Sequence, residues 1–254
     1  PINFTIAPRI IDEVKKVAPK THLFGFKLLS GVEHEELIRA AYEIVLSSGA
    51  TAVIANDANK LQEKFAITKE RAIHPMEKDK LADWILEMIV DEYYETHLVK
   101  DPSRLPVGAL DGLEQAANRA RSLIEQYKEK FVEVENGLIF GTVAVRSGLG
   151  FMTTGRGKKE LGSIVHVLNV DKLDRLVMVA GDVKASLNAP LMGAIFQNEQ
   201  VDHVVHYHQQ EPGLPTLPYA PPGTVRDSNR PVETSFNIEA HGCMLLFNKH
   251  GERI

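Results

Sequence analysis

The spacing of apolar residues along the chain predicts an alternation of helices and strands. Apolar positions recur with the helical period in five segments, 8–17, 35–46, 77–94, 113–134 and 190–196. Short runs rich in β-branched and aromatic residues predict strands over 21–28, 52–55, 65–68, 138–146, 150–153, 164–170, 176–179, 201–208 and 243–247. Helices interspersed among strands in this way predict a mixed α/β fold.

The first part of the chain has the order strand, helix, strand, which predicts a parallel βαβ unit with a right-handed crossover. Ligands of such sheets bind beyond the carboxyl ends of the strands. Lys27, Asn56 and Asp57 come at these ends and are candidates for binding a phosphate or a nucleotide. The alternatives are structural: Lys27 as a strand-end lysine that reaches solvent, and Asn56 as a cap or turn residue.

Four short motifs of this part occur in the same order as in a known family of ligases. They are Pro8-Arg9-Ile10-Ile11, Gly25-Phe26-Lys27-Leu28, Ala55-Asn56-Asp57 and residues 80–86. They resemble the C-terminal part of phosphopantothenoylcysteine synthetase, the phosphopantothenate–cysteine ligase of coenzyme A biosynthesis. The resemblance implies a nucleotide, CTP or ATP, at Lys27, Asn56 and Asp57. The family's first Rossmann-like half has no counterpart after Pro1, so we expect a partial Rossmann-like domain over 1–99. Its uncovered apolar surface predicts a homo-oligomer.

A polar stretch with two prolines, 100–108, has the composition of a domain boundary. We therefore expect a linker over 100–109 and a second domain over 110–254. In that domain a long helix precedes several short strands, a short helix and a further strand, which predicts an α+β or mixed α/β/α arrangement.

The strand over 201–208 carries two histidines, His206 and His208, at a spacing of two. Because side chains alternate across a strand, both imidazoles project from the same face and could hold one metal ion. A divalent transition ion suits such ligands, zinc first among them. Two histidines bonded to backbone carbonyls at a strand end are an equally simple explanation, and a third ligand has to come from elsewhere, either His241 or His250.

Four motifs in this half occur in the order of a known superfamily: residues 137–146, Met152-Thr153-Thr154-Gly155-Arg156, Val204–His208 and Leu245–Gly251. They resemble the class II aldolase and adducin superfamily, which implies an α/β/α domain, a metal held by His206, His208 and His250, and a phosphate or other small anionic metabolite beside it. The residues expected to bind that anion are Gly141, Thr142, Thr154, Gly155 and Ser186. The structural alternatives are tight turns for the glycines and surface positions for the threonines.

We favour His250 over His241 because the strand over 243–247 would deliver it and its context fits the resemblance better. His241 follows a helix-like segment, 236–240, and its position is typical of a helix C-terminal residue.

One departure concerns the proton-transferring acid of the active aldolases, a glutamate that follows serines upstream of the metal strand. The corresponding stretch here is Ala185-Ser186-Leu187-Asn188, and leucine cannot transfer a proton, so the catalytic residues are unknown. The sequence also ends at Ile254, soon after the last motif. Three functions stay open: a ligase-like domain joined to a metal-binding domain for a small phosphorylated metabolite, a metal-dependent lyase, and an inactive adducin-like assembly module.

Composition narrows the classes of partner. The hydrophobic content of 44% and charged content of 25% are ordinary for a globular protein. With 29 basic and 34 acidic residues the net charge is -5, which argues against nucleic acid as a partner. A single cysteine, Cys243, excludes an internal disulfide and suggests the cytoplasm, and the absence of an apolar run of about 18 residues argues against a membrane partner.

Overall fold

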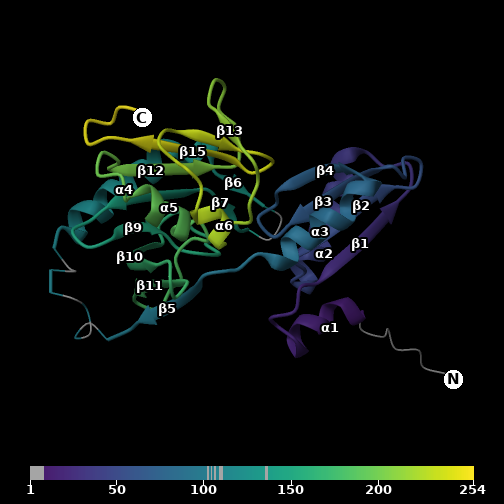
Figure 1. Ribbon diagram of the computed structural model, residues 1–254, viewed down its shortest axis with the longest axis horizontal. Coiled ribbons are helices and arrows are strands. Elements are labelled where there is room, and N and C mark those ends of the chain that lie inside the picture. Colours follow the sequence, from purple (N-terminus) through teal and green to yellow (C-terminus); the bar gives the residue numbers. More distant parts are fainter. Residues whose placement is uncertain (1–8, 102, 104, 106, 109–110, 135–136) are drawn as a thin grey trace. The chain divides into compact units, whose positions relative to one another are not determined.

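The computed structural model describes residues 9–101, 103, 105, 107–108, 111–134 and 137–254. Residues 102, 104, 106 and 109 of the linker expected at 100–109 lie outside the described residues. The helix expected over 113–134 ends earlier, at Tyr127, and a 3-10 turn and a short strand at Val132–Glu133 follow it. The chain divides into two compact units, Pro1–Val90 and Asp91–Ile254. Figure 1 shows them coloured from purple to blue and from teal to yellow, respectively.

The first unit is a four-stranded sheet in the order β1-β2-β3-β4. Its strands are β1 (Phe24–Leu29), β2 (Ala52–Asp57), β3 (Glu63–Thr68) and β4 (Ile73–Glu77). Its helices are α1 (Ile10–Val17), α2 (His34–Ser48), the short 3-10 helix η1 (Lys78–Lys80) and α3 (Leu81–Val90). The predicted parallel βαβ unit is confirmed, because β1 and β2 pair in parallel and α2 connects them. The pairs β2–β3 and β3–β4 are antiparallel.

The amphipathic helix α2 provides much of the core of this unit. Its buried residues recur at helical spacing and include Leu37, Ala41 and Val45. The helix ends at Gly49, whose left-handed conformation (φ 65°) lets its N–H bond to the carbonyl of Val45. Burial of one apolar stripe on the sheet therefore positions α2, and with it the crossover between the two parallel strands.

Strand β1 lies at an edge of this sheet, and its apolar side chains are not all covered. The side chains of Phe26 and Leu28 project from the same face of the strand and are 65% and 57% exposed within this chain. An exposed apolar edge is the feature from which a homo-oligomer was expected, and the oligomer itself stays a prediction.

The buried His74 makes the stability of the first unit depend on pH. Desolvation lowers the pKa of His74 to about 4, and its ring lies 5.5 Å from that of Trp84, the only tryptophan of the chain. The unfolded chain binds a proton near pH 6.5 and the folded chain only near pH 4, so stability is lost as the pH falls through this window. The loss amounts to about 3 kcal/mol.

We expect Trp84 fluorescence to report both the protonation of His74 and the unfolding of the first unit, because protonated histidine quenches a neighbouring indole. Urea unfolding between pH 4 and 7 should give a stability that rises with pH, and His74→Phe should flatten this rise. An unchanged pH dependence in the variant would show that another group is responsible.

The second unit is a nine-stranded sheet in the order β13-β14-β15-β12-β8-β9-β10-β11-β5. Its strands are β5 (Glu95–Val99), β8 (Thr142–Arg146), β9 (Phe151–Thr154), β10 (Ile164–Asp171), β11 (Leu176–Ala180), β12 (His203–Tyr207), β13 (Thr216–Leu217), β14 (Phe236–Ile238) and β15 (Gly242–Phe247). The helices are α4 (Leu113–Tyr127), the 3-10 helix η3 (Lys128–Lys130), α5 (Ala189–Ile195) and α6 (Val225–Ser228), and a small separate hairpin contains β6 (Val132–Glu133) and β7 (Ile139–Phe140).

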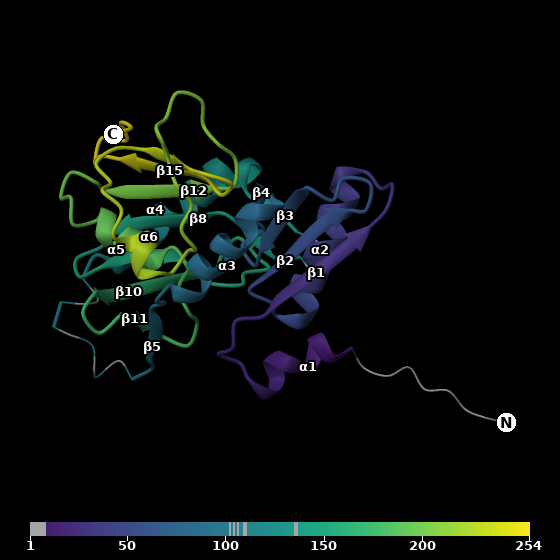
Figure 2. The same ribbon diagram turned by 45° about the vertical axis from the view of Figure 1, so that its right-hand side comes forward.

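The two faces of the large sheet pack against different helices, α5 on one face and α4 on the other (Figure 2). One core contains Leu191 and Met192 of α5 together with Val204 of β12, and the other contains Ala120 of α4 together with Val205 of the same strand. Alternation along β12 thus sends successive side chains to opposite layers. The predicted α/β/α arrangement is confirmed.

Several boundaries differ from those predicted. Residues 91–99 were assigned to the first domain, but β5 pairs in parallel with β11 and so belongs to the second unit. The helix over 77–94 is confined to α3 after η1. The segment 236–240 was expected to be helical and instead contains β14, because it pairs with β15. Local spacing could not reveal this pairing, because it joins strands that are held together only in the folded sheet.

None of the described helices is both long enough and apolar enough to cross a bilayer.

Candidate metal centre

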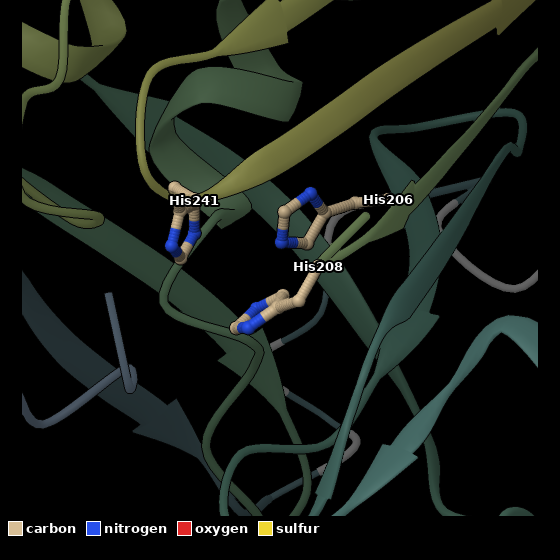
Figure 3. A group of neighbouring side chains, drawn as sticks. All are labelled: His206, His208 and His241. Carbon is tan, nitrogen blue, oxygen red and sulfur yellow. The ribbon is translucent and has the colours of Figure 1, made fainter. Parts of the chain in front are cut away.

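Three histidines converge at one end of the large sheet (Figure 3). His206, His208 and His241 each offer a ring nitrogen, and these atoms all lie within 4.8 Å of one another. The centroids of their rings are 4.6 to 5.1 Å apart. The prediction that His206 and His208 project from one face of their strand agrees with this arrangement.

The strand register explains why His241 is the third member. Strand β12 runs antiparallel to β15, with His206 opposite Met244 and Tyr207 opposite Cys243. His241 directly precedes β15 and therefore lies where β12 ends, beside His208. The start of β15 requires glycine at position 242. Its φ is 117°, and a Cβ added there would lie 2.0 Å from the carbonyl oxygen of Tyr207.

The structure does not bring His250, the third ligand expected from the sequence, to the other two histidines. His250 follows the other end of β15, where Phe247 pairs with His203 at the start of β12. With a rise of about 3.4 Å per residue, the six residues of β15 separate the two ends by roughly 17 Å. The side chain of His250 is exposed, and its backbone N–H donates to Asn248 Oδ1 at 2.9 Å. The antiparallel pairing of β12 with β15 therefore brings His241, which precedes β15, to His206 and His208, and not His250, which follows it.

His206 is held by a backbone hydrogen bond in an orientation that suits a metal ligand. It is completely buried, and its Nδ1–H donates to the carbonyl oxygen of Cys243 at 2.8 Å. That bond fixes the tautomer and leaves the lone pair on Nε2, which is buried and has no hydrogen-bond partner among the described residues. Burial lowers the pKa of His206 to about 4, so the ring is neutral at physiological pH and able to bind a metal.

The three imidazoles fit a zinc-like ion with an open coordination position. Tetrahedral bonds of about 2.0–2.1 Å place ligand nitrogens roughly 3.4 Å apart, so nitrogens that lie up to 4.8 Å apart would have to approach one another to share an ion. The ring of Phe140 stacks on His208 at 5.0 Å, and the ring of Tyr219 lies edge-on to His241 at 6.0 Å. These aromatic neighbours limit how far the imidazoles can turn.

Two of the residues expected to bind an anion lie beside the histidines. Thr142 is opposite His206 in the pairing of β8 with β12, so the two side chains share a face. The hydroxyl of Thr142 is 3.1 Å from that of Ser186, and both side chains are buried. A pair of bonded hydroxyls retains one hydroxyl hydrogen that can be donated to a ligand.

Both expected glycines are closely packed, and their binding of an anion stays a prediction. A Cβ on Gly141 would lie 2.1 Å from the ring of Phe131, and one on Gly155 would lie 2.7 Å from Ser163 Oγ. The N–H of Gly155 donates to the carbonyl of Ser163 at 2.9 Å. Close packing therefore explains both glycines, and the amide of Gly155 is engaged within the protein.

Thr154 is separated from Thr142 by the alternation of β9. The hydroxyl of Thr153 donates to Val143 O at 2.8 Å and lies 3.7 Å from the sulfur of Met192, in the layer of α5. Its neighbour Thr154 therefore projects toward the other layer. The hydroxyl of Thr154 is buried and has no partner among the described residues.

The stretch Ala185–Asn188 contains no carboxylate. Leu187 lies against Gly223, where a Cβ would be 3.5 Å from Leu187 Cδ2. Asn188 is buried, its N–H donates to Ser186 Oγ at 3.3 Å, and its Oδ1 has no partner among the described residues. An amide can hold a ligand by hydrogen bonds but cannot serve as a general base.

Sequence reasoning missed Lys158, which is buried near the histidines and donates from Nζ to the carbonyl of Gly141. Its signal was its place in Gly155-Arg156-Gly157-Lys158, directly after the second proposed anion loop. A lysine in such a loop is expected to be exposed unless the fold turns it inward.

In the first unit, strand pairing places Lys27 opposite Ala55 and next to the Leu28–Asn56 pair. Asn56 is buried, and Asp57 Oδ1 accepts from the backbone N–H groups of Asn59 at 2.9 Å and Gly31 at 3.3 Å. Asp57 thus stabilises the loops at the carboxyl ends of β1 and β2. The role of these residues in binding a nucleotide stays a prediction.

Comparison with known proteins gave matches that each cover part of the chain. No family model matches it. Over 49 residues it is 45% identical to the coenzyme A biosynthesis bifunctional protein CoaBC of Thermococcus kodakarensis, a stretch that is 19% of this chain and 12% of that protein. The chain thus spans only a small fraction of the curated relative it matches.

Two solved structures are similar in part. The DNA/pantothenate metabolism flavoprotein of Streptococcus pneumoniae is 30% identical with a TM-score of 0.31, covering 32% of this chain and 39% of that one. The L-fuculose-1-phosphate aldolase of Thermus thermophilus is 14% identical with a TM-score of 0.38, covering 54% of this chain and 82% of that one.

Over 49 residues the chain is thus similar in sequence to a coenzyme A biosynthesis protein, as one of its two sets of motifs predicted, and an L-fuculose-1-phosphate aldolase is among the solved structures that match it in part.

Proposed function

We propose that the second unit binds a divalent transition metal, zinc in the first place, through His206, His208 and His241, and a small phosphorylated or otherwise anionic metabolite beside it. The convergence of three ring nitrogens within 4.8 Å is the observation that carries this proposal. The buried Nε2 of His206, left without a partner among the described residues, supports it further, because an unsatisfied buried nitrogen costs stability unless something binds it.

When bound, such an ion acts as a Lewis acid toward a carbonyl or phosphoryl oxygen at its open position. The protein's own groups orient the ligand: the hydroxyl pair of Thr142 and Ser186 donates from one side, and the ring of Phe140 stacks on one face of His208. Asn188 presents a buried amide near Ser186.

Binding is a better-supported role for this site than rapid aldol cleavage. General acid–base catalysis typically contributes about 10² to 10⁴ in rate, and neither Leu187 nor Asn188 can supply it. We therefore propose slow or absent lyase turnover, with an adducin-like binding or assembly role as the second candidate for this unit.

For the first unit we propose a contribution to phosphopantothenate–cysteine ligase chemistry, with a nucleotide near Lys27 and Asn56. The 45% identity to CoaBC supports it. Because that match spans 12% of the relative, the whole activity of the relative is not carried over.

Metal titration tests the proposed centre directly. Protein stripped with a chelator should bind one equivalent of Co²⁺, with the intense visible absorption of a tetrahedral site, and Zn²⁺ should displace it. Absence of binding at micromolar metal, or the pale octahedral spectrum of a surface site, would contradict the proposal.

A further inference from the structure

The segment that follows His208 is fastened by one buried side chain, Asn237 of β14. Only 4% of Asn237 is exposed. Its Oδ1 accepts from the N–H of Glu211 at 2.9 Å, and its Nδ2 donates to the carbonyl of Glu211 at 2.9 Å and, over a longer 3.5 Å, to that of Leu214. The side-chain amide thus pairs with the backbone of Glu211 much as a residue of a neighbouring strand would.

The side chain of Glu211 is held as well. Its carboxylate accepts from the hydroxyl of the buried Tyr207 and forms an ion pair with Lys130 at 3.4 Å. Only two residues lie between Glu211 and His208. So short a connection limits how far the backbone of His208 can move while Glu211 stays in place.

Strand β14 connects the same amide to the other two histidines. Asn237 pairs with Cys243 of β15, and the carbonyl of Cys243 accepts from Nδ1 of His206 at 2.8 Å. Three residues separate Asn237 from His241, whose N–H donates to the carbonyl of Ile238 at 3.1 Å in the turn between β14 and β15. One position of β14 is therefore joined by short connections to all three imidazoles.

The core of the second unit does not require an amide at this position. The residues on either side of Asn237 are apolar and lie in the layer of α5, so Asn237 projects to the opposite layer, which contains Cys243. A buried amide costs free energy unless it is hydrogen-bonded. The hydrogen bonds of the Asn237 side chain go to the backbone of Glu211 and Leu214. What the amide contributes beyond packing is therefore the attachment of this segment.

We propose that Asn237 is a positioning residue of the metal centre: its amide fastens the segment after His208 to the strand that leads into His241, and so sets the separation of these two imidazoles. Their ring centroids are 4.6 Å apart. The inference rests on the proposed function for the metal itself, but the positioning applies to the metal-free protein too. A purely structural role for Asn237 would change the stability of the second unit and leave the metal affinity of the folded protein unchanged.

Asn237→Leu, which nearly keeps the size of the side chain and removes both hydrogen-bonding groups, tests the assignment. Loss of a residue that orients a metal ligand typically costs about 10- to 100-fold in metal affinity, so the folded variant should bind Co²⁺ more weakly than the wild type by a factor in this range. Competition with a chromophoric chelator, at a temperature where circular dichroism shows the fold to be intact, measures the affinity.

Asn248→Leu is the matched control. The side chain of Asn248 also fastens a backbone turn, because its Oδ1 accepts from the N–H groups of His250 at 2.9 Å and Glu252 at 3.0 Å. That turn follows the other end of β15, away from the histidine cluster. Asn248→Leu should therefore bind Co²⁺ with the affinity of the wild type.

Nuclear magnetic resonance of the metal-free protein separates this inference from the metal proposal. The ring protons of His208 and His241 should show a nuclear Overhauser effect in the wild type, because the two rings are close, and Asn237→Leu should lose it. This loss, together with absent metal binding by the wild type, would contradict the metal centre and still support Asn237.

Asn237→Asp keeps the test decisive if the leucine variant does not fold. An aspartate retains an oxygen that accepts from the N–H of Glu211 but has no N–H to donate to the carbonyl, so metal affinity and the Overhauser effect should both decrease. Three results would overturn the proposal: no Overhauser effect between His208 and His241 in the wild type, an unchanged effect or metal affinity in the folded Asn237 variants, or an equal loss of affinity in Asn248→Leu.

Discussion

His206→Ala and His241→Ala are expected to abolish tight binding of zinc or cobalt. Each removes one of three ring nitrogens that lie within 4.8 Å of one another. Loss of a mere outer-shell partner costs about 10- to 100-fold in metal affinity, so loss of a direct ligand should exceed 100-fold. Competition with a chromophoric chelator measures affinities over this range.

His250→Ala is the matched control, because it removes an exposed histidine at the other end of β15. It should bind metal with the affinity of the wild type. A large loss in His250→Ala together with tight binding by His241→Ala would restore the assignment made from sequence and refute the register argument.

Gly242→Ala is expected to lower the free energy of unfolding of the second unit by at least about 3 kcal/mol. The position has a φ of 117°, and an added Cβ would lie 2.0 Å from Tyr207 O and 2.6 Å from the Cα of His208. Both contacts are with backbone, so the clash can be relieved only by separating β15 from the end of β12. Because His241 precedes this glycine, metal affinity should fall as well.

Gly251→Ala is the matched control for backbone strain alone. Gly251 also has a positive φ, 79°, but nothing lies within 4 Å of the position that an added Cβ would take. A loss of about 1 to 2 kcal/mol is expected there. Denaturant unfolding followed by circular dichroism compares the two, and equal losses would show that the close approach at Gly242 is unimportant.

Patterns of short range were sufficient for much of the fold. The apolar stripe of the helix over 35–46 and the strands that flank it predicted the parallel βαβ unit. The spacing of His206 and His208 predicted a shared face, because side-chain alternation is a property of the strand itself. The four motifs of the second half predicted its α/β/α layers, which depend on the order of elements more than on exact contacts.

Other features depended on which strands pair and in which direction. The segment 236–240 contains a strand because β15 offers it hydrogen bonds, and 95–99 joins the second unit because β11 does so. Local periodicity predicts neither of these strands, because a short segment forms a strand only when a neighbouring strand is there to pair with it.

The sequence by itself determined that two histidines share one strand face and that polar residues with anion-binding chemistry occur nearby in the chain. Only the tertiary structure decided which residues meet. The antiparallel register of β12 and β15 brings His241 to the pair and carries His250 to the far end, and the alternation of β9 separates Thr154 from Thr142. The turn after Gly155 buries Lys158 without a balancing carboxylate among the described residues. Register and burial are set by packing across the whole sheet, so they cannot be predicted from the spacing of residues along the chain.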